Sequence, residues 1–124
     1  MNMTYDDQVD AMYLQIKDAE IARSEAIETD IVCDYDAANN VLGIELLWVS
    51  CNFNNAFSTI QRIEFADSNQ KKACLYYLLE HVDVSRSDDP TLSTRIDAAK
   101  KLFRNNNLVI EDTKDRLEGI FKKS

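Results

Sequence analysis

Residues 31–49 read IVCDYDAANNVLGIELLWV, and this stretch contains two runs in which apolar side chains occupy every second position. The alternating apolar residues are Ile31, Cys33 and Tyr35 in the first run and Leu42, Ile44, Leu46 and Trp48 in the second. A period of two is typical of a strand with one buried face. The polar residues 36–40 suit a hairpin connection, because Asp and Asn bond to their own backbone and tolerate left-handed geometry. The stretch therefore predicts a pair of antiparallel strands.

The same alternation occurs closer to the start of the sequence, where Met12, Leu14 and Ile16 alternate with tyrosine and polar residues. Weaker turn signals lie at residues 18–20 and 28–30. We therefore predict that residues 1–50 form an antiparallel β-meander of four or five short strands. A small sheet is not stable with both faces in water, so its apolar face needs a cover.

Residues 51–124 are expected to supply that cover as three or four helices, because apolar residues recur there at helical spacing. The expected helix starts are Asp67 or Ser68, Asp89-Pro90, and Asp112 or Thr113, with ends near Val82, Asn105 and Lys122. The pattern of residues 53–65 fits either a helix or, through Ile63 and Phe65, a strand, and we favour a helix that starts at Asn54 or Asn55. The apolar stripes are Leu75, Leu78, Leu79 and Val82, then Leu92, Ile96, Ala99 and Phe103, then Leu117, Ile120 and Phe121. These patterns together predict an α+β protein. Its acidic β-meander domain, residues 1–50, would pack against a helical extension, residues 51–124, as one structural unit.

Charge is distributed unevenly along the chain, which has a formal net charge of −8. Residues 1–51 hold 11 acidic residues and only two basic ones, Lys17 and Arg23, whereas residues 52–124 hold 11 acidic and 12 basic residues. Nucleic-acid binding relies on Lys and Arg that neutralise phosphates, so the first half is not expected to bind nucleic acid. An acidic half suits a basic protein partner or an imitation of nucleic acid. A surface that only keeps the protein soluble is the simpler alternative.

The three cysteines, Cys33, Cys51 and Cys74, contain no CxxC spacing, and His81 is the only histidine. An odd number of cysteines indicates free thiols in a reducing compartment. Asp6, Asp7 and Asp10 stand where a signal peptide would be apolar, so we expect a cytoplasmic protein without a signal peptide or membrane span. Each cysteine has apolar neighbours in the sequence and is expected to behave as a small hydrophobic residue. We expect no cofactor and no bound metal.

Three segments, TYDDQVDAMYL at residues 4–14, IVCDYD at 31–36 and VLGIELL at 41–47, resemble a family of short bacterial and phage domains of unknown function. The family pattern is Y-D-x-x-x-D-A-x-Y-[LI], then a D-Y/F-D strand end, then [LV]-x-G-[IL]-E-[IL]-L. The resemblance covers about residues 1–50 and implies a small antiparallel β-domain. Because family members often lie beside small toxin-like genes, it also implies antitoxin or adaptor roles. Family members commonly have a Gly in the last hairpin, where this chain has Asn39-Asn40, which can also supply a positive φ.

The carboxylates near the predicted turns have two interpretations. Asp6 and Asp10 can bond to backbone amides and fix a turn. Alternatively, Asp6, Asp7 and Asp10 could bind a divalent cation, although the ligand spacing and the Gly of a calcium loop are absent. Asp34 and Asp36 lie two residues apart and could form an acid/base pair, but a strand end beside a turn also explains them. We favour the structural interpretations.

The function expected from these observations is non-enzymatic. We predict a protein-interaction module, antitoxin-like or adaptor, that binds a basic protein partner through its acidic β-domain. The expected partner-binding residues are Asp6, Asp7, Asp10, Glu25, Glu28, Glu45 and Trp48. One alternative is a phage-type inhibitor of a bacterial defence nuclease that acts as an acidic mimic of nucleic acid. The other is a small enzyme built on the carboxylates of Asp6, Asp10, Asp34 and Asp36.

The last predicted strand, residues 41–49, has apolar side chains on both faces, with Leu47 and Trp48 on opposite sides. Such a strand is typical of a sheet that is covered on both faces. The helices can cover only one face of a small sheet. We therefore predict a homodimer, in which a second copy covers the other face.

Overall fold

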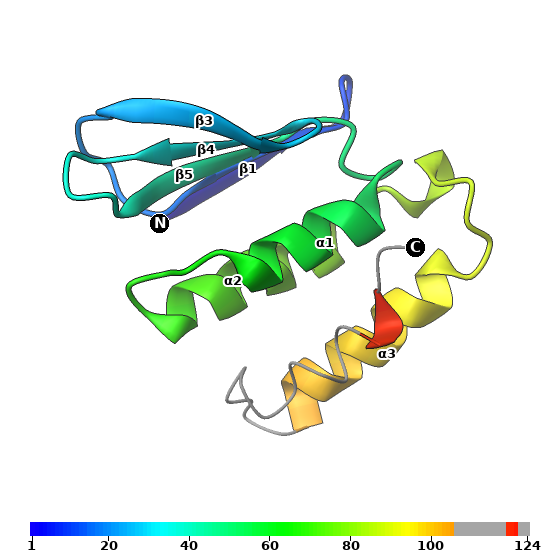
Figure 1. The fold of residues 1–124 in the computed structure, drawn as a ribbon. Coiled ribbons are helices and arrows are strands. Elements are labelled where there is room, and N and C mark those ends of the chain that lie inside the picture. Colours follow the sequence, from blue (N-terminus) through cyan, green and yellow to red (C-terminus); the bar gives the residue numbers. More distant parts are fainter. Residues whose placement is uncertain (106–118, 122–124) are drawn as a thin grey trace.

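The computed structural model of the chain describes residues 1–105 and 119–121, which form a five-stranded antiparallel sheet followed by three α-helices (Figure 1). The strands are β1 (Asn2–Asp6), β2 (Ala11–Gln15), β3 (Arg23–Glu28), β4 (Ile31–Tyr35) and β5 (Val41–Leu46). The helices are α1 (Phe53–Arg62), α2 (Ser68–His81) and α3 (Leu92–Asn105), with a short 3₁₀ helix, η1 (Val84–Arg86), before α3. The predicted α+β class is therefore confirmed. No helix in these ranges is both long and apolar enough to cross a membrane.

The strand order corrects the predicted meander, because the sheet runs β1-β2-β5-β4-β3. Only β3, β4 and β5 follow one another as a meander, while the β1–β2 hairpin pairs with the other edge of β5. The physical reason is that the strands differ in how much apolar surface they bury. β5 buries Leu42, Ile44 and Leu46 and takes the centre, whereas β3 is mostly exposed and forms an edge. Charged residues on an edge strand discourage pairing with other chains.

The hairpin between β4 and β5 forms as the polar residues 36–40 predict. Asn39 has a φ of 68°, which confirms that an Asn replaces the usual Gly at this turn. The Asp36 carboxylate accepts the backbone N–H groups of Ala38 and Asn40, each at 2.9 Å. These bonds from Asn40 and Ala38 hold the pKa of Asp36 below its ordinary value. Asp36 therefore fixes the turn.

β5 ends at Leu46, three residues before the predicted limit, because Trp48 adopts a φ of 54° and turns the chain. The outward positions on β5 are Gly43 and Glu45, so this strand is not apolar on both faces. Leu47 and Trp48 instead lie beyond the strand, with 38% and 55% of their surface exposed. The strand pattern that predicted a homodimer was therefore wrong about these two residues.

The three helices all lie on the same side of the sheet, with α3 farthest from it (Figure 1). The apolar stripes predicted for α2 and α3 are buried, except that Val82 follows the last residue of α2 and is only partly buried. The predicted start of α2 is confirmed, since Asp67 accepts the Asn69 N–H at 2.8 Å. Asp89 accepts the Thr91 N–H at 2.9 Å, but α3 begins at Leu92, two residues after the predicted Pro90. The core contains side chains from the sheet and from all three helices. One face of the sheet is thus buried, and the opposite face has no helix of the described chain on it.

Phe121 packs against α1, with ring centroids 5.1 Å from Phe53 and 4.5 Å from Phe57. Arg95 of α3 donates a hydrogen bond to the carbonyl of Ile120 at 3.1 Å. The helix predicted from Asp112 or Thr113 to Lys122 lies outside the described residues except for positions 119–121. Within these three positions, Phe121 is buried as its predicted apolar stripe requires.

Candidate functional site

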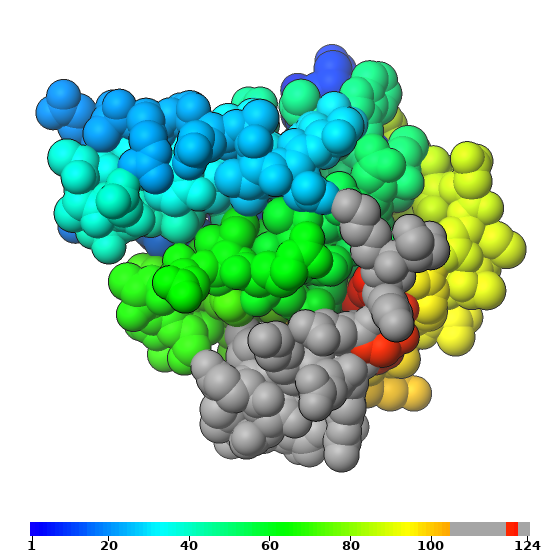
Figure 2. All heavy atoms as spheres, in the orientation of Figure 1, coloured from blue at the N-terminus to red at the C-terminus, as the bar shows by residue number. Residues whose placement is uncertain are grey.

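The uncovered side of the sheet, here called the outer face, carries the side chains that alternate with the buried ones. Its residues are Asn2, Thr4, Asp6, Ala11, Tyr13, Gln15, Ser24, Ala26, Val32, Asp34, Gly43 and Glu45. Three of them are acidic and none is Lys or Arg. Figure 2 shows the blue and cyan strands as the upper layer of the molecule, above the helical half. The outer face is therefore an acidic surface on which no helix of the described residues packs.

Tyr13 lies at the middle of the outer face and crosses β5 to reach β4. Its hydroxyl donates a hydrogen bond to the Asp34 carboxylate at 2.7 Å. Ser24 of β3 donates to the other oxygen of the same carboxylate at 2.6 Å. Burial and the contact with Asp34 raise the pKa of Tyr13 to about 12. The three side chains form a hydrogen-bonded chain across β2, β5, β4 and β3.

Gly43 is required by the position of Tyr13. A Cβ atom on Gly43 would lie 2.1 Å from the Tyr13 hydroxyl oxygen and 2.6 Å from Cζ of the ring. Both distances are far below van der Waals contact, so any other residue would displace the ring. Gly43 has an ordinary negative φ, so this glycine serves the close approach of a side chain rather than an unusual backbone conformation.

Glu45 is next to Tyr13 in the register and is exposed. Its carboxylate points away from the core, because its neighbours Ile44 and Leu46 are both fully buried on the other face. Asp6 lies at the end of β1 on the outer face, and it accepts the N–H of Gln8 at 3.0 Å. Asp6 therefore fixes the β1–β2 turn, as its structural interpretation predicts.

Asp10 differs from the other predicted site residues because it has no exposed surface. Its carboxylate accepts the Tyr5 hydroxyl at 2.8 Å, the Ser50 hydroxyl at 2.6 Å and the Ser50 N–H at 3.0 Å. Asp10 also has a φ of 55°, which Asp tolerates better than most residues. Its prediction as a partner-binding residue was therefore wrong, and the backbone N–H that its carboxylate accepts is that of Ser50 rather than one of the β1–β2 turn.

The hydrogen bonds of Asp10 continue into the helical half. The Ser50 hydroxyl accepts the N–H of Asp83, which follows α2, at 2.9 Å. Arg86 of η1 pairs with the Asp83 carboxylate at 3.2 Å and donates to the carbonyl of Asp7. This group of residues, the Asp10 cluster, joins the β1–β2 turn to the connection after β5 and to η1.

The remaining predicted partner-binding residues lie on different parts of the surface. Glu25 is on the same side of the sheet as Cys33, at the β3 edge, and pairs with Arg23 at 3.5 Å. Glu28 ends β3 and lines a hollow beside α1. Asp7 and Trp48 are exposed near the end of the sheet that holds the β1–β2 turn. Of the seven predicted residues, only Asp6 and Glu45 belong to the outer face.

The central residues of the outer face were not among the predicted partner-binding residues. Tyr13, Ser24 and Gly43 were absent from that set, and Asp34 was considered only as one half of an acid/base pair. The period of two could have found them, because it places them on the same side as Glu45. The carboxylates of Asp34 and Asp36 have separate partners, as the favoured structural interpretation expects, since Asp34 bonds to Tyr13 and Ser24 whereas Asp36 bonds to its own turn.

The four carboxylates proposed for an enzyme do not meet in one place. Asp6 and Asp10 lie near the Leu46 end of β5, while Asp34 pairs with Gly43 near its other end. No group of three His, Cys, Asp or Glu residues within residues 1–105 and 119–121 could hold a metal ion. These positions offer no shared site for acid/base chemistry.

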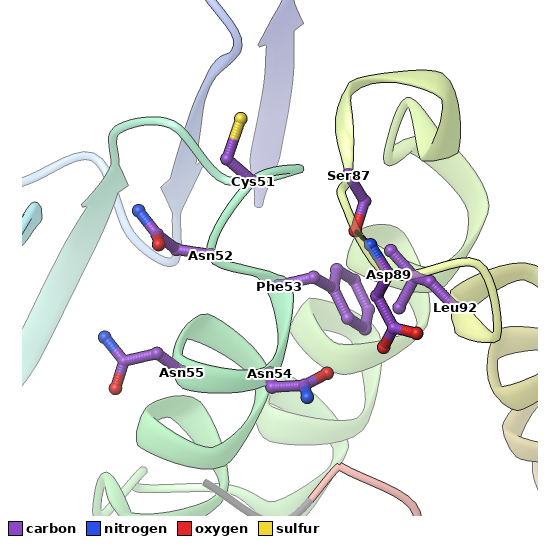
Figure 3. A pocket seen from close by; sticks show the side chains of 8 residues that line it. All are labelled: Cys51, Asn52, Phe53, Asn54, Asn55, Ser87, Asp89 and Leu92. Carbon is purple, nitrogen blue, oxygen red and sulfur yellow. Dashed lines mark hydrogen bonds between the residues drawn. The ribbon is translucent and has the colours of Figure 1, made fainter. Parts of the chain in front are cut away.

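Cys51 differs from the other two cysteines because it is exposed, contrary to the expectation from its apolar neighbours. It lines a pocket of about 210 Å³ between the start of α1 and residues 87–92 (Figure 3). Its thiol donates to the carbonyl of Arg86 at 3.4 Å, and the side chain points away from Phe53 and Leu92. His81 stacks on Tyr77 at 4.1 Å and does not line this pocket.

Residues 2–50 match the model of a protein family of unknown function, DUF2283. The resemblance predicted for residues 1–50 is therefore confirmed. No curated protein and no solved structure matches the chain. The matched segment contains the whole sheet, including Tyr13, Asp34 and Gly43, and also both Asp10 and Ser50. The helices lie outside it.

We predict that Asp10→Ala destabilises the protein by about 3 kcal/mol, because three donors would lose a charged acceptor in the interior. Asp10→Asn should cost less, since an amide retains one acceptor and Asn tolerates a positive φ. Urea unfolding followed by circular dichroism measures both. Asp7→Ala, at an exposed side chain, is the control and should change the free energy of unfolding by less than about 0.5 kcal/mol. Equal stability of the Asp7 and Asp10 variants would contradict the role of the cluster.

We predict that Gly43→Ala lowers the pKa of Tyr13 from about 12 toward its ordinary value of about 10, because the ring is pushed into water and away from Asp34. NMR titration of ¹³Cζ-labelled tyrosines measures this. Gly119→Ala is the matched control, since nothing lies within 4 Å of a Cβ at that position. An unchanged Tyr13 titration in Gly43→Ala would show that the ring does not lie across Gly43.

We predict that iodoacetamide modifies Cys51 alone in the native protein. Cys33 and Cys74 are buried, so the reagent cannot reach their thiols. Burial also raises the pKa of Cys33, and it raises that of Cys74 to about 12, so both thiols stay protonated at neutral pH. Intact mass should show one adduct in buffer and three in denaturant. Cys51→Ser should show none in buffer. Native modification of Cys33 or Cys74 at the rate of Cys51 would refute the assignment.

Proposed function

We propose that this protein is a non-enzymatic interaction module, antitoxin-like or adaptor, that binds a basic protein partner through the outer face of its sheet. One observation supports the proposal above all others. The sheet face on which no helix of the described residues packs carries Asp6, Asp34 and Glu45 and no Lys or Arg. A face of one charge sign attracts a partner of the opposite sign and steers its approach.

The shape of the outer face also suits a protein partner. Ala11, Ala26 and Gly43 are small, so a partner's side chains can approach the strands closely. Tyr13 crosses Gly43 to bond to the Asp34 carboxylate, and Glu45 is its partner in the strand register. An arginine side chain at this point would meet an aromatic ring and two carboxylates, which are its preferred contacts.

Exposed apolar residues at one end of the sheet extend the proposed surface. Val9 and Trp48 have 56% and 55% of their surface exposed. They belong to neighbouring segments, because the carbonyl of Asp10 accepts the N–H of Val49 at 3.1 Å. Trp is frequently a dominant residue of protein interfaces. Homodimerisation through this region stays a prediction, and light scattering of the wild type and of Trp48→Ala tests it.

The nuclease-inhibitor alternative would use the same acidic face as an imitation of nucleic acid. It adds one requirement, which is that DNA or RNA must compete with this protein for one surface of the partner. An adaptor has no such requirement. Competition by a short duplex therefore separates the two versions once a partner is purified.

The experiment is affinity capture by the full chain from a lysate of its own cells, followed by binding kinetics with the purified partner. We expect a basic partner whose association rate falls as salt rises, because salt screens the steering charges. Asp6→Lys combined with Glu45→Lys should weaken binding by about tenfold or more.

The control is Asp18→Lys combined with Glu20→Lys, which makes the same change of charge at exposed residues between β2 and β3. Its affinity should stay within about twofold of the wild type, because these residues lie off the outer face. Circular dichroism checks that both variants fold. Equal weakening by the two reversals would mean that only net charge matters, and no weakening by either would reject the outer face.

A further inference from the structure

Another hollow lies in the helical half of the molecule, between α2 and α3, and has a volume of about 360 Å³. Asn69, Lys72, Ala73 and Tyr76 line it from α2, and Phe103 and Arg104 line it from α3. The four α2 residues are spaced i, i+3, i+4 and i+7, so they form one continuous face of that helix. This volume lies within the range of small-molecule sites.

The floor of this groove is apolar and its rim is cationic. Tyr76 and Phe103 pack with ring centroids 5.7 Å apart, and Ala73 lies one turn before Tyr76. Lys72 and Arg104 have no ion-pair partner within the described part of the chain, and no acidic residue lines the groove. Asp67 caps the adjacent start of α2, so its charge offsets the partial charge of that helix end. Two cations that have no ion-pair partner among residues 1–105 and 119–121 therefore supply the attraction.

We propose that the groove between α2 and α3 binds a monocarboxylate with an apolar chain, of the size of a medium-chain fatty acid. The chain covers Ala73, Tyr76 and Phe103, and the carboxylate accepts hydrogen bonds from Lys72 and Arg104. Both parts of such a ligand match the groove, since apolar surface drives burial and a charged pair selects the headgroup. This site is independent of the outer face, which carries the opposite charge.

The test compares three probes with the same ten-carbon chain and different headgroups: decanoate, decan-1-ol and decylammonium, each below its micelle concentration. Calorimetry measures affinity, and amide NMR shifts locate the site. We expect saturable binding of decanoate, weaker binding of decan-1-ol and the weakest binding of decylammonium. The largest shifts should fall on residues 69–76 and 103–104.

Two variants separate the headgroup from the chain. Lys72→Gln combined with Arg104→Gln should weaken decanoate by about tenfold and leave decan-1-ol within about twofold, because only the charged contacts are lost. Ala73→Phe should abolish both by filling the floor. Lys101→Gln removes an exposed lysine of α3 that does not line the groove, and it should change neither affinity. Thermal unfolding of each variant checks that the fold is kept.

Any of the following results would overturn the proposal. If decylammonium bound as tightly as decanoate, the groove would not select the charge of the headgroup. Shifts that map elsewhere, or no saturable binding, would show that the groove does not take this ligand. Binding of an acidic amphipathic peptide in place of decanoate would assign the groove to a protein partner. Loss of decanoate binding after the Asp6→Lys and Glu45→Lys reversal would show that the two surfaces are not independent.

Discussion

The packing of the sheet against the helical half depends on the hydrogen bonds of the buried Asp10 carboxylate. A carboxylate in the interior is costly unless hydrogen bonds replace its water, and here Tyr5 and Ser50 donate three of them. The Ser50 hydroxyl in turn accepts the N–H of Asp83. Hydrogen bonds that start from one carboxylate therefore connect the β1–β2 turn, the start of the helical half and the end of α2. The orientation of α1 under the sheet follows from this connection, since Phe53 begins α1 only three residues after Ser50.

This arrangement places an acidic sheet face and a cationic groove on different sides of the molecule. The helices pack on one face of the sheet, which leaves the acidic outer face open at the other end of the molecule from the groove between α2 and α3. Charges of opposite sign on different sides of one small domain can attract different partners, because salt screens each charge over a short distance. The adaptor interpretation draws support from this separation as well as from the outer face alone.

The sequence predicted much of the fold and less of the candidate site. The alternation of Cys33, Ile44 and their neighbours predicted strands, since period-two burial is a local property. The caps at Asp67 and Asp89 were equally local. The pairing of β2 with β5 was not predictable in this way, because a meander and the observed order bury the same residues. The motif residues Tyr13 and Gly43 were visible in the sequence, but their contact joins strands 30 positions apart.

The sequence by itself determined which segments become strands and helices and which side of each strand is buried, because turn chemistry and hydrophobic spacing act over a few residues. It also determined that the first half is acidic. Only the tertiary structure decided which carboxylates face water. It enclosed Asp10, placed Glu25 at an edge beside Arg23, and left Glu45 open beside Tyr13. The reason is physical: the exposure of a charged side chain depends on what packs against it, and those neighbours come from distant parts of the chain.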